Sequence, residues 1–120
     1  MSLKERTRFL TRPEEVDAFL KANSAAAIFK AGLCHKNQET FAFVERHLET
    51  RDDLPLGIIR VVEHRSASNH VASLTGIVHE SPQLIFFKDG KAVFDRDNWD
   101  ITDEAVAEGL EGQLARSPAL

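Results

Sequence analysis

The strongest constraint on the fold is an alternation of short, largely apolar runs with longer segments of helical periodicity. The runs at 25–31 and 54–62 are apolar on both faces, which is typical of strands buried inside a parallel sheet. The segments at 11–23 and 35–50 repeat apolar residues at spacings of three and four, as amphipathic helices do. Because helices separate the strands, the pattern predicts parallel pairing and an α/β fold.

The C-terminal half continues this pattern and adds a hairpin. Residues 66–78 have the apolar spacing of a short helix, and residues 101–115 have that of an amphipathic helix. Between them, residues 81–96 have the pattern of two strands joined by Asp89-Gly90, a dipeptide that favours two-residue hairpin turns. The last strand is therefore expected to run antiparallel to its neighbour.

The predicted elements follow one another as α-β-α-β-α-β-β-α. This order is that of the thioredoxin-like fold, a central four-stranded mixed sheet with helices on both faces, here with an optional short N-terminal strand at residues 7–10. The 120 residues are enough for one hydrophobic core and contain no repeat or interior linker. A single domain over 1–120 is predicted, with its core at about 11–115.

Composition excludes several classes of protein. Charged residues make up 28% of the chain and the net charge of −4 is spread along it, so nucleic-acid binding is not expected. No apolar run is long enough to span a membrane, and the N-terminus has no apolar signal core. A single cysteine cannot form an internal disulfide, and together with the missing signal this indicates a reducing cytoplasm. The chain is expected to be a monomer or a weak dimer.

The single cysteine, Cys34, is the strongest candidate for a catalytic residue. It lies in a loop after a strand, where open α/β sheets place their ligand sites, and directly before a helix. The positive end of the helix dipole favours a thiolate there, and basic neighbours would act in the same direction, namely Lys30, Lys36 and a protonated His35. The alternative is a small, buried and inert cysteine, which position alone does not exclude.

A second candidate site is Ser81-Pro82, directly before a buried strand. The bond between these residues could be trans, which is the usual form, or cis. A cis bond would turn the backbone of Ser81 outward as an unpaired edge, to which an extended peptide or a thiol tripeptide could bind. Ser81 and Pro82 are therefore candidate substrate-binding residues.

Metal and nucleotide sites are not expected. The histidines include no pair with the spacing of a helical metal site, and one cysteine cannot build a zinc cluster. His79, beside the proline, is interpreted as a solvated or core-edge histidine, and Trp99 is expected to pack in the core or at its rim. No bound cofactor is predicted.

Five short motifs of the chain stand out together. They are IFK before the cysteine loop, EHRSASN at 63–69, HESPQ at 79–83, FKDGKAVF at 87–94 and WDIT at 99–102. In their order and spacing these motifs resemble one known family, the thioredoxin-like monothiol bacilliredoxins of the YtxJ type, and the resemblance extends over roughly residues 13–111.

The resemblance implies a thioredoxin-like fold in which Pro82 is a cis-proline opposite the thiol. It also implies an activity, the removal of bacillithiol from mixed disulfides on proteins by a single attacking cysteine. The implied partners are oxidised client proteins and a low-molecular thiol, bacillithiol or similar, which acts as a co-substrate and is not a bound cofactor.

The sequence departs from the family at the cysteine itself. The family has Thr-Cys-Pro-Ile-Ser at the head of the helix, whereas this chain has Leu-Cys-His-Lys-Asn at 33–37. The loop from Lys30 to Cys34 is also one residue shorter. Either His35 occupies the position of the family's cysteine, or a loop deletion restores the match at Cys34. A one-residue shift would swing the sulfur by up to ~100° around the helix start.

Two functions follow from these observations. In the first, the chain is a monothiol thiol–disulfide oxidoreductase in which Cys34 attacks a thiol adduct on a client protein and Ser81-Pro82 dock the adduct. In the second, it is a non-catalytic thioredoxin-like binding or adaptor module, or a stress protein, that keeps the fold without the usual cysteine motif. Its Ser81-Pro82 edge would still bind extended chains.

Overall fold

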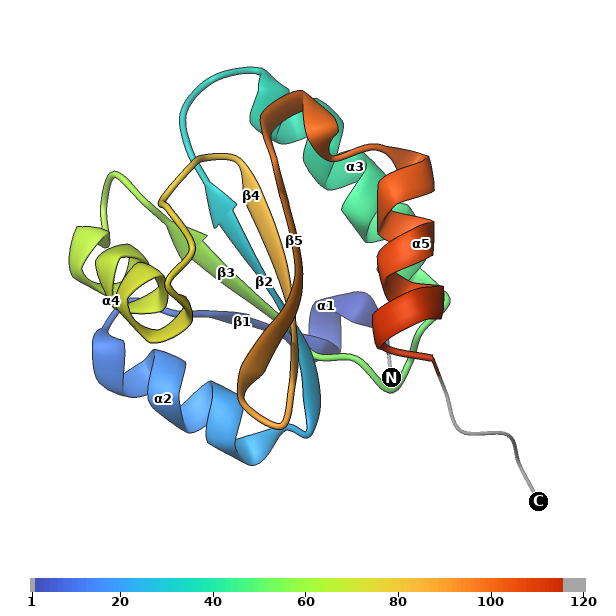
Figure 1. Cartoon of the computed structure of the whole chain (residues 1–120). Coiled ribbons are helices and arrows are strands. Elements are labelled where there is room, and N and C mark those ends of the chain that lie inside the picture. The colour runs from blue at the N-terminus through green and yellow to red at the C-terminus, as the bar shows by residue number, and fades with distance from the viewer. Residues whose placement is uncertain (1, 116–120) are drawn as a thin grey trace.

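A mixed five-stranded sheet forms the centre of the molecule, in a computed structural model that describes residues 2–115 (Figure 1). The strand order is β1-β3-β2-β4-β5. Strands β1, β3 and β2 are parallel to one another, while β4 is antiparallel to β2 and β5 to β4. The strands span Thr7–Phe9, Ala25–Ala31, Leu56–Arg60, Gln83–Lys88 and Lys91–Asp97, in the order β1 to β5.

The predicted α/β architecture is confirmed, and the optional N-terminal strand is present as β1, which makes the sheet five-stranded. The predicted hairpin also forms between β4 and β5. Asp89 and Gly90 both have positive φ, 51° and 80°, as a two-residue turn of this type requires. Glycine adopts such a conformation without strain, which explains its place in the turn.

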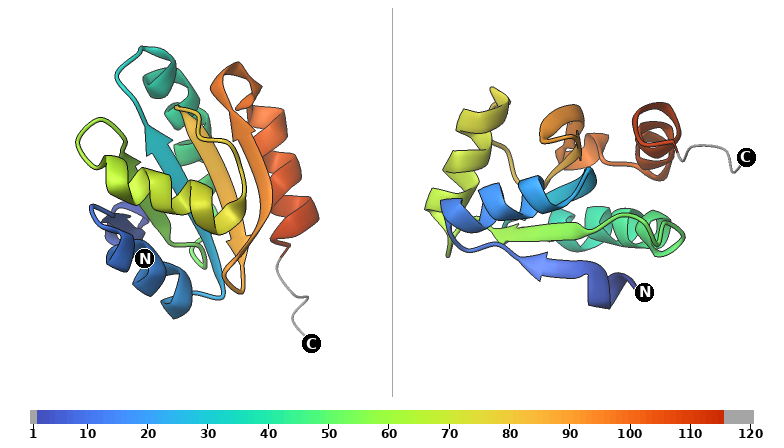
Figure 2. Two further views of the ribbon diagram at one scale, coloured as in Figure 1. Left: turned by 60° about the vertical axis from the view of Figure 1, so that its left-hand side comes forward. Right: turned by 90° about the horizontal axis from the view of Figure 1, so that it is seen from below.

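Two pairs of helices cover the two faces of the sheet (Figures 1 and 2). Helices α2 (Pro13–Ala22) and α4 (Arg65–Thr75) bury apolar side chains against one face, in a cluster with Ile28 of β2 and Ile85 of β4. Helices α3 (Lys36–Glu49) and α5 (Asp103–Gln113) bury theirs against the other face. Strand β2 lies between both layers, so its apolar sequence is explained by burial on both sides.

The core extends further toward the N-terminus than residue 11. A short helix, α1 (Leu3–Arg6), places Leu3 in the α3/α5 cluster. Arg6 is also buried, and its guanidinium donates hydrogen bonds to the main-chain carbonyls of residues 48, 51 and 54. The N-terminal segment therefore closes one edge of the domain, which the sequence pattern did not indicate.

Within the described residues, no helix is both long and apolar enough to cross a membrane.

Candidate functional site

Cys34 lies in the loop between the end of β2 and the start of α3, and its side chain is exposed. This loop is at the top of Figure 1, on the same side of the molecule as the short 3-10 helix η1 (Asn98–Asp100). His35 is the N-cap residue of α3, so Cys34 immediately precedes the helix, as the sequence predicted. A buried cysteine is therefore excluded as the description of this residue.

Asn37 makes hydrogen bonds to the loop that carries Cys34, residues 32–35, which we call the thiol loop. The sequence analysis did not identify Asn37 as a site residue. Its side-chain Nδ2 lies 3.3 Å from Cys34 Sγ and 2.7 Å from the Cys34 carbonyl oxygen. Its Oδ1 accepts a 2.6 Å hydrogen bond from the Gly32 N–H. Because Asn37 is buried, its amide is a hydrogen-bond donor held in a fixed position beside the sulfur. Its position three residues after Cys34, at the start of a predicted helix, is the sequence feature that could have indicated a contact with the cysteine loop.

The thiol loop lies directly against Ser81, whose peptide bond to Pro82 is cis. A Cβ atom placed on Gly32 would lie 2.8 Å from Ser81 Oγ and 3.3 Å from Ser81 Cβ. Only glycine leaves room for this approach. The structure therefore brings together the two segments that the sequence singled out, although they are separated by almost fifty residues.

The start of α3 is connected to the Pro82 segment through Asn98 of η1. Lys36 Nζ donates a 2.8 Å hydrogen bond to Asn98 Oδ1, and the Asn98 backbone N–H donates to the Pro82 carbonyl at 2.9 Å. Asn98 Nδ2 also donates to a Glu80 carboxylate oxygen at 3.3 Å. The ammonium of Lys36 is thus held at η1. No local sequence signal linked Lys36 to Asn98.

Exposed apolar side chains lie at or close to the two chain neighbours of Cys34, Leu33 and His35. The ring of His35 lies 6.3 Å from the ring of Trp99, measured between centroids. Trp99 is 52% exposed and Leu33, which precedes the cysteine, is 85% exposed. Trp99 is thus a rim residue, one of the two positions expected for it.

Lys30 is not brought to the thiol. It is completely buried in β2, on the sheet face that is covered by α2 and α4, whereas α3 lies on the other face. Its Nζ lies 3.2 Å from His79 Nδ1, and Ser68 Oγ lies 3.1 Å from the same nitrogen. Burial lowers the pKa of the Lys30 ammonium from 10.5 to about 8. The sequence analysis expected the charge of Lys30 to stabilise the thiolate, but the Lys30 ammonium instead contacts His79, in the segment before Pro82.

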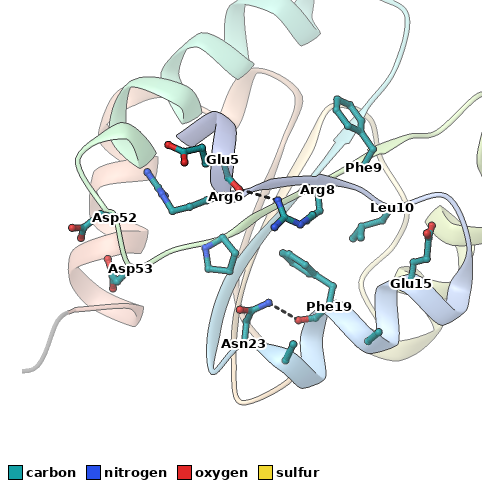
Figure 3. Close-up of a pocket in the computed structure, with 13 residues that line it drawn as sticks. Glu5, Arg6, Arg8, Phe9, Leu10, Glu15, Phe19, Asn23, Asp52 and Asp53 are labelled. Atoms are coloured by element: carbon teal, nitrogen blue, oxygen red, sulfur yellow. Dashed lines mark hydrogen bonds between the residues drawn. The ribbon is translucent and has the colours of Figure 1, made fainter. Parts of the chain in front are cut away.

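A separate pocket of about 620 Å³ lies between β1 and α2 (Figure 3). Arg8, Phe19 and Asn23 line it, together with Pro55 at the entry to β3. Neither Cys34 nor Ser81 is among the residues that line this pocket. The described part of the chain contains no cluster of three or more histidine, cysteine, aspartate or glutamate side chains that could hold a metal ion.

Comparison with known proteins gives a consistent result. The family model for the monothiol bacilliredoxin BrxC matches residues 8–106 of the chain. Among solved structures, one protein described as having a thioredoxin fold superposes with a TM-score of 0.81 at 23% identity, covering 88% of this chain and 95% of that one. Mitochondrial thioredoxin 3 of Saccharomyces cerevisiae superposes with a TM-score of 0.75 at 16% identity, covering 92% and 98%.

A thioredoxin variant from Halobacterium salinarum is similar in the same way, with a TM-score of 0.72 at 21% identity over 93% of this chain and 94% of that one. At these identities the structural similarity establishes the fold. The expected thioredoxin-like fold is therefore confirmed.

Proposed function

The chain belongs to the monothiol bacilliredoxin family, and on that basis we propose that it is a thiol–disulfide oxidoreductase that removes low-molecular thiol adducts, such as bacillithiol, from oxidised proteins. The observation that supports this most directly is the exposed Cys34 thiol, fixed at the start of α3 with the Asn37 amide 3.3 Å from its sulfur. The nucleophile of thiol–disulfide exchange is a thiolate, which this position favours.

In the first step, the Cys34 thiolate attacks the sulfur of the low-molecular thiol in the mixed disulfide on the client protein. A disulfide forms between Cys34 and the low-molecular thiol, the client–adduct S–S bond breaks, and the client sulfur leaves as a thiolate with the bonding electron pair. The buried Asn37 amide keeps its donor at the attacking sulfur, so the thiol does not have to reorganise its surroundings before attack.

In the second step, a low-molecular thiolate from solution attacks the adducted sulfur and releases Cys34 as a thiolate. The product is the symmetric disulfide of the low-molecular thiol. An external thiol is required because Cys34 is the single cysteine of the chain. This co-substrate is plentiful in a reducing cytoplasm, where we place the protein.

The adduct and the client backbone are expected to dock at Ser81. Within residues 2–115, the main-chain N–H and carbonyl of Ser81 make no hydrogen bond, and this residue lies against the Gly32 turn of the thiol loop. An extended segment could therefore pair with Ser81 as an added strand does with a sheet edge. We expect the exposed Leu33 and Trp99 side chains to contact the client as well.

The test uses a protein that carries a bacillithiol adduct, with glutathione and cysteine adducts on the same protein for comparison. We expect the wild-type chain to release the client thiol and to gain one adduct on Cys34, as seen by mass spectrometry. The Cys34→Ser variant should do neither. Equal rates of release with the wild type and the variant would refute the proposal. A wild type that holds the client without releasing the adduct would instead support the adaptor function.

A further inference from the structure

Lys30 is an unusual group for the interior of this fold. Its side chain is fully buried in the central sheet, and no carboxylate in the described part of the chain lies within salt-bridge distance of its Nζ. The other buried cation, Arg6, is satisfied by several main-chain carbonyls. Burying an ammonium without a counter-ion opposes folding, so core packing does not explain Lys30.

The contact of Lys30 with His79 has a defined chemistry. An ammonium can only donate hydrogen bonds, so Nδ1 of His79 must accept, and the ring is neutral with its proton on Nε2. The Ser68 hydroxyl lies at the same nitrogen. The pKa of His79 is lowered, first by burial and then by the charge of Lys30, with a smaller effect of Arg65, while Glu80 acts in the opposite direction. The surroundings therefore keep His79 in the form that accepts from Lys30.

This contact supports the segment that leads to the thiol site. Residues 77–82 connect α4 to β4, and His79 is two residues before Ser81. The same segment is held by Gln83, whose Nε2 donates to the Val78 carbonyl at 3.0 Å, and Gln83 is the register partner of Lys30 on the neighbouring strand. Lys30 and Gln83, two buried polar side chains on adjacent strands, thus contact two consecutive residues of this short loop, His79 and Val78.

We propose that Lys30 is a positioning residue for the thiol site: through His79 it holds residues 77–82 in place and so sets Ser81 against the loop of Cys34. Lys30 acts from the face of β2 that α2 and α4 cover, and it does not contact the substrate. Only the effect on exchange rate rests on the proposed function. The effect on Ser81 is a property of the structure alone.

The support depends on pH in both directions. On the acid side, protonation of His79 converts Nδ1 into a donor and places a second cation beside Lys30, so the contact is lost. On the alkaline side, Lys30 loses its proton and a charged hydrogen bond becomes a weaker neutral one. The segment should therefore be held most firmly between the pKa of His79, which lies below its usual value, and that of Lys30, about 8.

The first experiment uses NMR on wild type, on Lys30→Met and on Lys88→Met, a control lysine that is exposed at the end of β4. In the wild type, the His79 ring and the Ser81 and Gly32 amides should share a transition near pH 8. In Lys30→Met this transition should vanish and the midpoint of His79 should rise. The proposal would be overturned if the chemical shifts of the Ser81 and Gly32 amides changed neither near pH 8 nor on substitution of Lys30. This outcome does not depend on whether Cys34 is catalytic.

The second experiment measures Cys34 at pH 7.5 with two reagents, iodoacetamide and a peptide that carries a bacillithiol adduct. Positioning predicts that Lys30→Met leaves the iodoacetamide rate within about twofold but slows the peptide reaction roughly tenfold, the size expected for one lost docking hydrogen bond. His79→Leu should slow the peptide reaction to a similar extent. His79→Gln keeps a hydrogen-bond acceptor for Lys30, so its peptide reaction should remain close to the wild-type rate. Parallel losses with both reagents, or no rescue by glutamine, would contradict the positioning role.

Discussion

Replacement of the buried lysine by methionine should stabilise the protein at neutral pH. Methionine is similar in length to lysine and carries no charge, so Lys30→Met removes the unpaired ammonium while filling the same space in β2. The pKa of Lys30 falls from 10.5 to about 8 because of burial. At 1.36 kcal/mol per pKa unit, the charged form destabilises the fold by about 3 kcal/mol at pH 7.

The net gain is smaller because the substitution also removes the contact with His79. One hydrogen bond contributes about 1 kcal/mol, so the free energy of unfolding at pH 7 should rise by about 2 kcal/mol in Lys30→Met. The sign of the pH dependence follows from the depressed pKa. Between pH 8 and 10.5 the unfolded chain binds the proton more tightly than the folded chain, so wild-type stability rises with pH over this range. The variant lacks that rise.

Urea denaturation at pH 7, 8 and 10 would measure this difference, with Lys88→Met as the exposed control. The advantage of Lys30→Met over wild type should be largest at pH 7 and should disappear by pH 10. A variant that is less stable than wild type at pH 7 would refute the reasoning. So would a difference that stays constant between pH 7 and pH 10, because the ammonium would then not be the source of the instability.

Three further substitutions test the geometry of the site and of the N-terminal edge. Gly32→Ala should lower the free energy of unfolding by about 1–3 kcal/mol and slow exchange at Cys34, because the new Cβ would collide with Ser81. An unchanged stability and an unchanged exchange rate in a stopped-flow assay would show that the loop has room for the methyl group. Asn37→Ala should lower the free energy of unfolding, measured in urea, by about 1–3 kcal/mol, since the Gly32 N–H loses its buried acceptor. It should also lower the alkylation rate of the Cys34 thiol, and an unchanged rate would mean that Asn37 has no role at the thiol. Arg6→Met leaves three main-chain carbonyls without their donor, so it should lower the free energy of unfolding by at least about 2 kcal/mol, and a neutral result in thermal denaturation would mean that those carbonyls find other donors.

Much of the fold could be predicted from local patterns. Strand β2 reads as a strand because it is apolar on both sides, and the turn at Asp89-Gly90 reads as a hairpin because its residues tolerate positive φ. The edge strand β1 was the weakest prediction, since three residues carry almost no periodicity. Helix α1 was missed because four residues with one buried leucine give no amphipathic pattern.

The prediction for Lys30 failed for a different reason. Its closeness to Cys34 along the chain suggested closeness in space, but side chains alternate along a strand, and Ile28 and Lys30 share the face opposite α3. The two-residue period was available in the sequence. What it could not supply was the partner, because His79 reaches Lys30 only when β4 pairs with β2.

The sequence by itself determined the element order, the family and the place of one thiol before a helix, because each depends on residues close together in the chain. Tertiary structure alone decided what surrounds that thiol: Ser81 against Gly32, Asn98 against Lys36 and His79 over Lys30. These pairs are separated by about fifty residues or more, and their contact depends on strand pairing and on which face each side chain takes. Neither is encoded in a local pattern, so the chemistry of the site appears only when the sheet is assembled.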